Sequence, residues 1–192
     1  MKTFSKSKSL RYAGNRVKLF SIPEFLTFTI REFNLDSVNL ICKINNKFSN
    51  HIVAIRSSAK DEDTKNNSAA GEYESVLNIP SDNTERIIES INIVIASYEK
   101  KRQLLSDDEV IIQEMVKNPT MSGVIFTHDL NTGAPYYVIN YDDQSGTIDT
   151  VTSGNGEYAN RTLYIHRNSI GKLRSERFIK LLQAVRARAS NE

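Results

Sequence analysis

A long apolar face at helical spacing constrains the fold more than any other feature of this sequence. Asp82, with Glu85 three residues later, has the spacing of a capping box. The apolar residues that follow recur at intervals of three and four. They are Ile87, Ile88, Ile91, Val94, Ile95 and Tyr98. Three basic residues (100–102) close the segment, where cations favour the negative end of a helix dipole. We therefore predict a helix that packs across a sheet.

From Val110 onward the apolar residues follow the period of two that is typical of strands. We predict strands at residues 110–116, 123–128, 136–141, 147–152 and 162–166. A turn over residues 131–133 (Asn-Thr-Gly) joins the second strand to the third. A final helix begins near Ser175. These strands are expected to form an antiparallel meander.

The first half of the chain alternates helical and strand-like patterns. Helices are predicted over residues 5–17 and after Asp36, which can cap the second one. The apolar positions of that second helix are Val38, Ile41, Ile44 and Phe48. Strands are predicted over residues 25–30 and 52–56 because β-branched and aromatic residues dominate there.

This order of elements indicates the α+β class with mixed α/β character. We expect a mixed α/β first lobe (residues 1–103) and a mostly antiparallel β second lobe (104–192). A hinge near residues 104–109 would separate the two lobes across a cleft. A length of 192 residues suits either one domain or two such lobes.

Composition narrows the class of function. The chain is 39% hydrophobic and 25% charged, as expected of a soluble protein with a core, and it has no apolar run near the roughly 20 residues of a membrane span. A net charge of +2 is too small to indicate nucleic-acid or membrane binding. The single cysteine, Cys42, excludes an internal disulfide and fits a reducing cytoplasm.

The segment from Ile52 to Ile79 carries the chemistry. It begins as a β-branched strand, breaks at Arg56 and continues through small, polar and charged residues to a strand-like run from Tyr73. A guanidinium at a strand end, followed by hydroxyls such as Ser57, suits a phosphate-rich ligand. A surface loop whose arginine forms a salt bridge is the alternative. No P-loop and no metal-ligand spacing of His or Cys is present.

Two blocks of residues resemble a known family. The first block comprises Ala54-Ile-Arg-Ser-Ser-Ala, the acidic pair Glu62-Asp63, Asn67-Ser-Ala-Ala-Gly71 and Glu74-Ser-Val-Leu-Asn78. The second comprises Ile112-Gln-Glu-Met-Val116, Ser122-Gly-Val-Ile-Phe-Thr127 and Asp129-x-x-Thr-Gly133. In order and separation these blocks are similar to the N-terminal nucleotide-binding domain of the pyruvate phosphate dikinase and phosphoenolpyruvate synthase family.

The resemblance implies an ATP-grasp-like, two-lobed fold that holds Mg-ATP between its lobes. In this family a phosphoryl group passes from ATP to a histidine on a separate domain. The final acceptor, pyruvate or another molecule, stays open. A non-catalytic nucleotide-binding or assembly module that keeps the fold is the alternative, as is a scaffold that binds no nucleotide.

The resemblance also assigns residues. Arg56 matches the arginine that contacts ATP phosphates and stabilises charge in phosphoryl transfer, with Ser57 beside it. Gly71 matches a glycine at which backbone approaches the phosphates. The family's phosphate-binding lysine matches Lys6 or Lys8. The strand whose backbone recognises adenine is matched by Gln113, Glu114, Met115 and Val116.

Two departures limit the resemblance. The family's Gly-Leu-Gly-Glu segment has only an echo at Gly154-Asn-Gly-Glu157, which leaves Glu157 a weak candidate. The family's last strand, which carries magnesium-binding acidic residues, would come after Glu192. We therefore expect no metal ligands within these residues, and weak ATP binding without turnover by the chain alone.

Overall fold

The computed structural model describes residues 5–14, 19–59, 63–64, 67–68, 73–153 and 161–189. It divides into two compact units, Met1–Arg16 with Ser21–Met115, and Val17–Phe20 with Val116–Glu192. The division falls later in the chain than the expected boundary after residue 103. Residues 104–115 join the first unit because they include a strand of its sheet. Each unit is described separately below.

The first unit is built on a four-stranded antiparallel sheet in the order β1-β6-β2-β5. Its strands are β1 (Phe25–Thr29), β6 (Glu109–Glu114), β2 (Ile52–Ser58) and β5 (Ser75–Pro80). Two further short strands, β3 (Asp63–Thr64) and β4 (Asn67–Ser68), pair only with each other.

The prediction that residues 110–116 begin the meander of the second half is wrong. This strand, β6, lies between β1 and β2, and its residues Val110 to Gln113 are all buried. A strand with neighbours on both sides is buried along its length, so its sequence resembles a continuous apolar run. Local pattern identifies such a strand but does not identify its partners.

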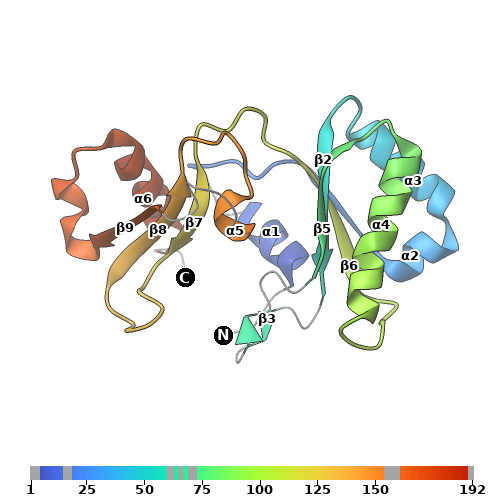
Figure 1. Ribbon diagram of the computed structural model, residues 1–192, viewed down its shortest axis with the longest axis horizontal. Helices are drawn as coiled ribbons and strands as arrows, with labels where there is room; N and C mark the ends of the chain where they lie inside the picture. The colour runs from blue at the N-terminus through green and yellow to red at the C-terminus, as the bar shows by residue number, and fades with distance from the viewer. Residues whose placement is uncertain are drawn as a thin grey trace. The chain divides into compact units, whose positions relative to one another are not determined.

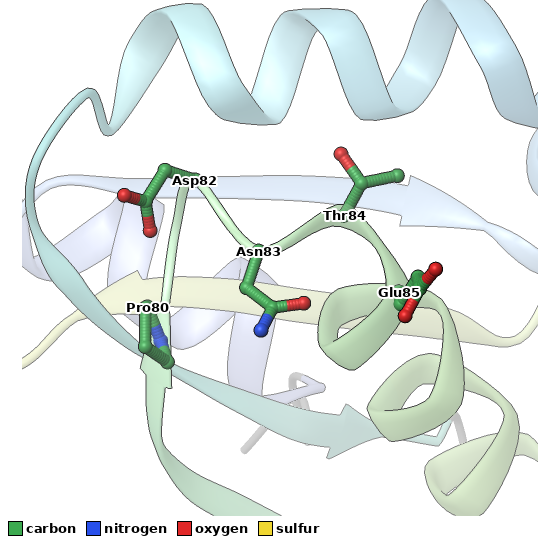
Figure 2. Close-up of a pocket in the computed structure, with 5 residues that line it drawn as sticks. All are labelled: Pro80, Asp82, Asn83, Thr84 and Glu85. Carbon is green, nitrogen blue, oxygen red and sulfur yellow. The ribbon is translucent and has the colours of Figure 1, made fainter.

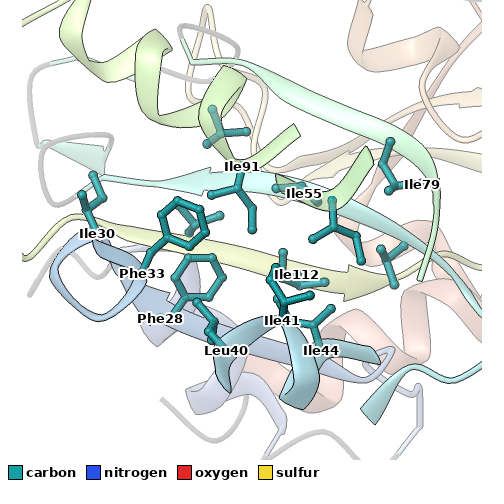
Figure 3. Close-up of a cluster of buried hydrophobic side chains, with 14 of the residues drawn as sticks. Phe28, Ile30, Phe33, Leu40, Ile41, Ile44, Ile55, Ile79, Ile91 and Ile112 are labelled. Carbon is teal, nitrogen blue, oxygen red and sulfur yellow. The ribbon is translucent and has the colours of Figure 1, made fainter. Parts of the chain in front are cut away.

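Three helices cover one face of this sheet: α2 (Ile30–Leu35), α3 (Ser37–Lys47) and α4 (Thr84–Glu99) (Figure 1). Their apolar side chains and those of the sheet form one core, part of which Figure 3 shows. The predicted face of α4 is confirmed, since Ile87, Ile91, Val94 and Tyr98 are 0% exposed. The cap is Asn83 rather than Asp82, because the Asn83 side chain accepts the Arg86 N–H at 3.0 Å.

The helices before β2 differ from prediction in two details. An additional helix, α2, begins with a capping box in which Thr29 and Glu32 satisfy each other's backbone N–H groups. Asp36 caps α3 as predicted, but Val38 is 77% exposed and Leu40 lies in the core instead. Leu40 shares the inward face with Ile44 at a spacing of four, whereas Val38 lies at the edge of that face.

The first helix, α1 (Lys6–Gly14), lies against the opposite face of the sheet from α4 (Figure 1). Its buried residues are Ser7 and Ala13, so it contributes little apolar surface to the unit. The uncovered part of this sheet face is where the polar side chains of β2 and β6 project, as described below.

The second unit contains a three-stranded antiparallel sheet in the order β7-β8-β9. Its strands are β7 (Ser122–Phe126), β8 (Tyr136–Asp142) and β9 (Arg161–His166). A 3-10 helix, η1 (Arg167–Lys172), and the final helix, α6 (Glu176–Ala189), follow. The core of this unit consists of Tyr137, Ile139, Ile165, Ile170, Phe178 and Leu182.

Two predictions for this unit have opposite outcomes. The turn at 131–133 is confirmed, because Asp129 Oδ1 accepts the Thr132 N–H and hydroxyl, each at 2.8 Å, and Gly133 has a φ of 70°. The strand at 147–152 is wrong. Its residues include the helical turn α5 (Thr150–Ser153), and the Thr150 hydroxyl donates to Asp142 at 2.7 Å.

Asp142 organises this loop. Its carboxylate accepts hydrogen bonds from the hydroxyls of Ser145 and Thr150 and from the backbone N–H groups of Gln144 and Ser145. These bonds, with that from the Ser145 hydroxyl the largest cause, hold the pKa of Asp142 far below its usual range. Hydrogen bonds from side chains to a nearby carboxylate compete with strand pairing. This competition explains why residues 147–152 do not form the predicted strand.

No helix within the described ranges is both long enough and apolar enough to span a bilayer.

Gly123 in β7 provides a test of the second sheet. A Cβ at this position would lie 2.2 Å from the carbonyl oxygen of Asn140 on β8. We expect Gly123→Ala to lower the free energy of unfolding by about 1–3 kcal/mol, because backbone atoms must move to relieve the overlap. Urea denaturation monitored by tyrosine fluorescence measures this change.

Gly171→Ala is the matched control, since a Cβ there meets nothing within 4 Å. Equal stability of the two variants would contradict the pairing of β7 with β8 described here.

Candidate functional site

Arg56 lies on the sheet face that α2, α3 and α4 leave uncovered. Successive side chains of a strand point to opposite faces, and Val53 and Ile55 point into the core with these helices. Ala54 and Arg56 therefore point the other way. Ala54 pairs with Gln113, and the Arg56 guanidinium donates through Nη1 to Gln113 Oε1 at 3.4 Å. The buried amide of Gln113 thus orients the half-buried arginine.

The alternative interpretation of Arg56 was a structural salt bridge. Among the residues that the structure describes, no carboxylate pairs with Arg56; its recorded partner is the neutral Gln113 side chain. A guanidinium held by one neutral acceptor keeps most of its donors for a ligand. The environment of Arg56 is therefore suited to binding an anion.

Lys6 lies at the same end of β2. Its ammonium donates to the Ser57 hydroxyl at 3.4 Å, and Ser57 is fully buried next to Arg56 in the chain. The helix α1 delivers this lysine, because its first turn packs against β2. Two positive charges from distant parts of the sequence therefore approach one strand end.

The sequence left the choice between Lys6 and Lys8 open. The structure brings Lys6 to Ser57, whereas the Lys8 side chain is exposed to solvent. Residues two apart on a helix do not share a face, so both lysines cannot approach the strand end together.

Two further predicted site residues, Gly71 and Glu157, lie outside the described residues.

The predicted adenine-recognising segment, residues 113–116, begins in the last residues of β6 and continues past the end of that strand. The Glu114 N–H donates to Glu24 O at 2.8 Å, and the Met115 N–H donates to Ile52 O at 2.9 Å. These two amides are therefore occupied within the sheet. The amide of Val116 has no hydrogen-bond partner within the part of the chain that the structure describes, and its side chain is 55% exposed.

A surface hollow lies elsewhere in the first unit, at the junction of β5 and α4 (Figure 2). Pro80, Asp82, Asn83, Thr84 and Glu85 line it. The two carboxylates would repel an anionic ligand, and the Asn83 side chain caps the helix. This hollow contains none of the predicted site residues.

Sequence reasoning missed three polar residues close to Lys6: Ser7, Ser58 and Glu109. The Ser7 N–H donates to Ser58 Oγ at 3.0 Å, and the Ser7 hydroxyl donates to the Glu109 carboxylate. The run of hydroxyls after Arg56 was a weak signal for Ser58. Nothing local connects Ser7 with partners 51 and 102 residues away.

Metal binding was not assigned to any residue in the sequence. Across the described ranges, no group of three or more His, Cys, Asp and Glu side chains could hold a metal ion. The candidate site consists of two cationic side chains, Lys6 and Arg56, with the hydroxyl of Ser57 and the supporting amide of Gln113.

Comparison with known families adds an independent finding. Residues 27–142 match the family model of the pyruvate phosphate dikinase AMP/ATP-binding domain. This range is more than half of the 192 residues; it includes Arg56 and Gln113 to Val116, and begins after Lys6 and Lys8. A search of curated proteins finds no match to the chain.

Proposed function

The chain belongs to the family of the pyruvate phosphate dikinase AMP/ATP-binding domain, and from that premise we propose that Arg56 and Lys6 bind the phosphates of ATP. The mixed α/β fold with antiparallel sheets agrees with an ATP-grasp-like domain of this family. The finer proposal is that the domain serves a dikinase-type phosphotransferase of the phosphoenolpyruvate synthase or pyruvate phosphate dikinase kind. Such an enzyme passes a phosphoryl group from ATP to a histidine on another domain.

One observation carries the phosphate assignment: the Lys6 ammonium reaches Ser57, the residue next to Arg56. The planar guanidinium of Arg56 can donate two parallel hydrogen bonds to phosphoryl oxygens, while Lys6 adds a compact point charge. Ser57 is buried and precedes the end of β2 by one residue, so Lys6 contacts the same end of the strand that carries Arg56. Charge that develops on oxygen in phosphoryl transfer would be stabilised by the same two cations.

We assign adenine recognition to the residues that directly follow β6, and among them to the Val116 amide. The amides of Glu114 and Met115 are used by the sheet, so Val116 is the remaining donor for a ring nitrogen after this strand. Backbone recognition of this kind depends on strand position rather than on side-chain identity.

Magnesium would bind as part of Mg-ATP rather than at a site formed by the described residues of this chain. The described residues supply no acidic cluster for the ion, so no step is assigned to it here. If bound, the ion would neutralise phosphate charge. The residues of this chain bind and orient the triphosphate.

Arg56→Ala tests the phosphate assignment. We expect ATP affinity to fall about ten- to hundredfold, because hydrogen bonds to charged groups contribute roughly 1.5–3 kcal/mol each. The ATP affinity of Arg56→Lys should lie between those of the unsubstituted chain and Arg56→Ala. Lysine keeps the positive charge but lacks the planar guanidinium that donates two parallel hydrogen bonds. Isothermal titration with ATP, and separately with adenosine, measures both affinities.

Arg86→Ala is the control, because Arg86 is an exposed arginine of the same unit that pairs with Glu89. Affinity for adenosine should be unchanged by Arg56→Ala. An equal loss for ATP and adenosine would show that the substitution acts through folding rather than through phosphate contact.

Val116→Pro tests the adenine assignment by removing one amide hydrogen. We expect a roughly three- to tenfold loss of affinity for both ATP and adenosine, the contribution of one hydrogen bond. Val116→Ala, which retains the amide and truncates a half-exposed side chain, should bind as the unsubstituted chain does. If proline has no effect, the adenine lies elsewhere.

Transfer to histidine is tested by supplying the acceptor. The chain is mixed with phosphate-labelled ATP and a histidine-bearing domain of a phosphoenolpyruvate synthase. Acid-labile label on that domain, lost with Arg56→Ala, is the expected result. ATP binding without labelled histidine would instead favour the non-catalytic nucleotide-binding module.

A further inference from the structure

A buried polar cluster joins the first turn of α1 to the ends of β2 and β6. Ser7 and Ser58 are both 0% exposed. The Ser7 backbone N–H donates to Ser58 Oγ at 3.0 Å, and its hydroxyl donates to the Glu109 carboxylate. Buried polar groups are costly to leave unpaired, so this arrangement holds each member in place.

The strand side of the cluster is rigidly anchored. Ser58 and Glu109 are direct cross-strand neighbours of β2 and β6. The Tyr98 hydroxyl bridges them, accepting the Ser58 N–H at 2.8 Å and donating to the Glu109 carbonyl at 2.7 Å. Tyr98 itself is fully buried in the core. The position at which Ser7 docks is therefore fixed by the core of the first unit.

The helix side is joined to the sheet by further polar contacts, among them the hydrogen bond that Arg11 Nη2 donates to Thr27 Oγ1 of β1. Only Ser7 and Ala13 of α1 are buried, and the sequence of this helix is mostly polar. Apolar burial of about 25 cal/mol per Å² cannot contribute much for such a surface. Within the first turn, Ser7 donates to the strand ends through its N–H and its hydroxyl, and Ser5 Oγ contacts Ser7 Oγ at 3.0 Å.

Lys6 is the residue next to Ser7 in that turn. We propose that Ser7 and Glu109 are positioning residues, which fix the first turn of α1 so that the Lys6 ammonium stays beside Ser57 and Arg56. The inference rests on the proposed phosphate-binding role of Lys6 and adds residues that act through it. A lysine whose backbone is already fixed loses less conformational entropy when it binds a phosphate.

The family match begins at residue 27, so it assigns nothing to Ser7. Glu109 is an acidic residue near a cationic site, where its charge by itself would oppose anion binding. Its hydrogen bond from Ser7 gives it a structural purpose there.

A double-mutant cycle tests the inference in the full chain, with ATP affinity as the readout. Ser7→Ala should weaken ATP binding roughly three- to tenfold when Lys6 is present. The same substitution should have no further effect in the Lys6→Ala background, because its effect passes through the lysine. Ser9→Ala, another serine of α1, is the matched control and should bind as the unsubstituted chain does.

Glu109 offers a second route if Ser7→Ala does not fold. Glu109→Gln keeps an oxygen that accepts the Ser7 hydroxyl, and it should retain ATP affinity within about twofold. Glu109→Leu removes the acceptor and should lose affinity as Ser7→Ala does. Amide hydrogen exchange in α1 should accelerate with Glu109→Leu, while exchange in α3 stays unchanged.

The outcomes separate the two proposals. No ATP binding by the unsubstituted chain overturns the proposed function, and this inference with it. ATP binding that depends on Lys6 but is unaffected by Ser7→Ala and Glu109→Leu overturns the positioning role alone. Equal losses in the presence and absence of Lys6 also overturn it, because they indicate a general effect on folding.

Discussion

The pairing of β6 between β1 and β2 is the constraint on which the first unit depends. Val110 and Ile112 of this strand point into the core beneath the helices, while Gln113 points to the opposite face. The same strand begins at Glu109, the cross-strand neighbour of Ser58. One buried strand therefore sets the positions of the core, the partner of Arg56 and the acceptor of the Ser7 hydroxyl.

One face of the first sheet forms the apolar core, and the other face carries the polar side chains of the proposed site. The helix-covered face buries isoleucine, valine and phenylalanine side chains in one continuous core. The other face has charged and amide side chains, and α1 docks there through hydrogen bonds more than through apolar contact. Such a division allows cations to remain partly desolvated beside a rigid scaffold, where electrostatic interactions with a ligand are stronger than in water.

Among the residues that the structure describes, Asp142 has the most strongly perturbed pKa, and the cause is structural. Asp142 accepts four hydrogen bonds from its own loop and holds α5 in place within the second unit. A perturbed carboxylate is often a sign of a catalytic site, but ion-pair and hydrogen-bond networks that shape loops produce the same effect. The proposed site of this protein instead consists of the cationic side chains of Lys6 and Arg56, which contact the polar side chains of Ser57 and Gln113.

Sequence periodicity predicted most elements, because helical and strand patterns are local properties. Arg56 was singled out because it is an arginine at the end of an apolar strand. Two blocks of residues, rather than periodicity, carried the family resemblance, which the match to residues 27–142 confirms. Periodicity did not predict α2 or α5, where capping side chains override a short apolar pattern.

The sequence by itself therefore determined the secondary structure of the long elements and the family, and it singled out Arg56 as a candidate site residue. Tertiary structure alone decided that β6 joins the first sheet, that Lys6 rather than Lys8 reaches Ser57, and that Ser7 meets Glu109. The physical reason is sequence separation: these contacts join residues 51 to 102 positions apart. Whether such contacts form depends on how buried strands pair, which no local pattern encodes.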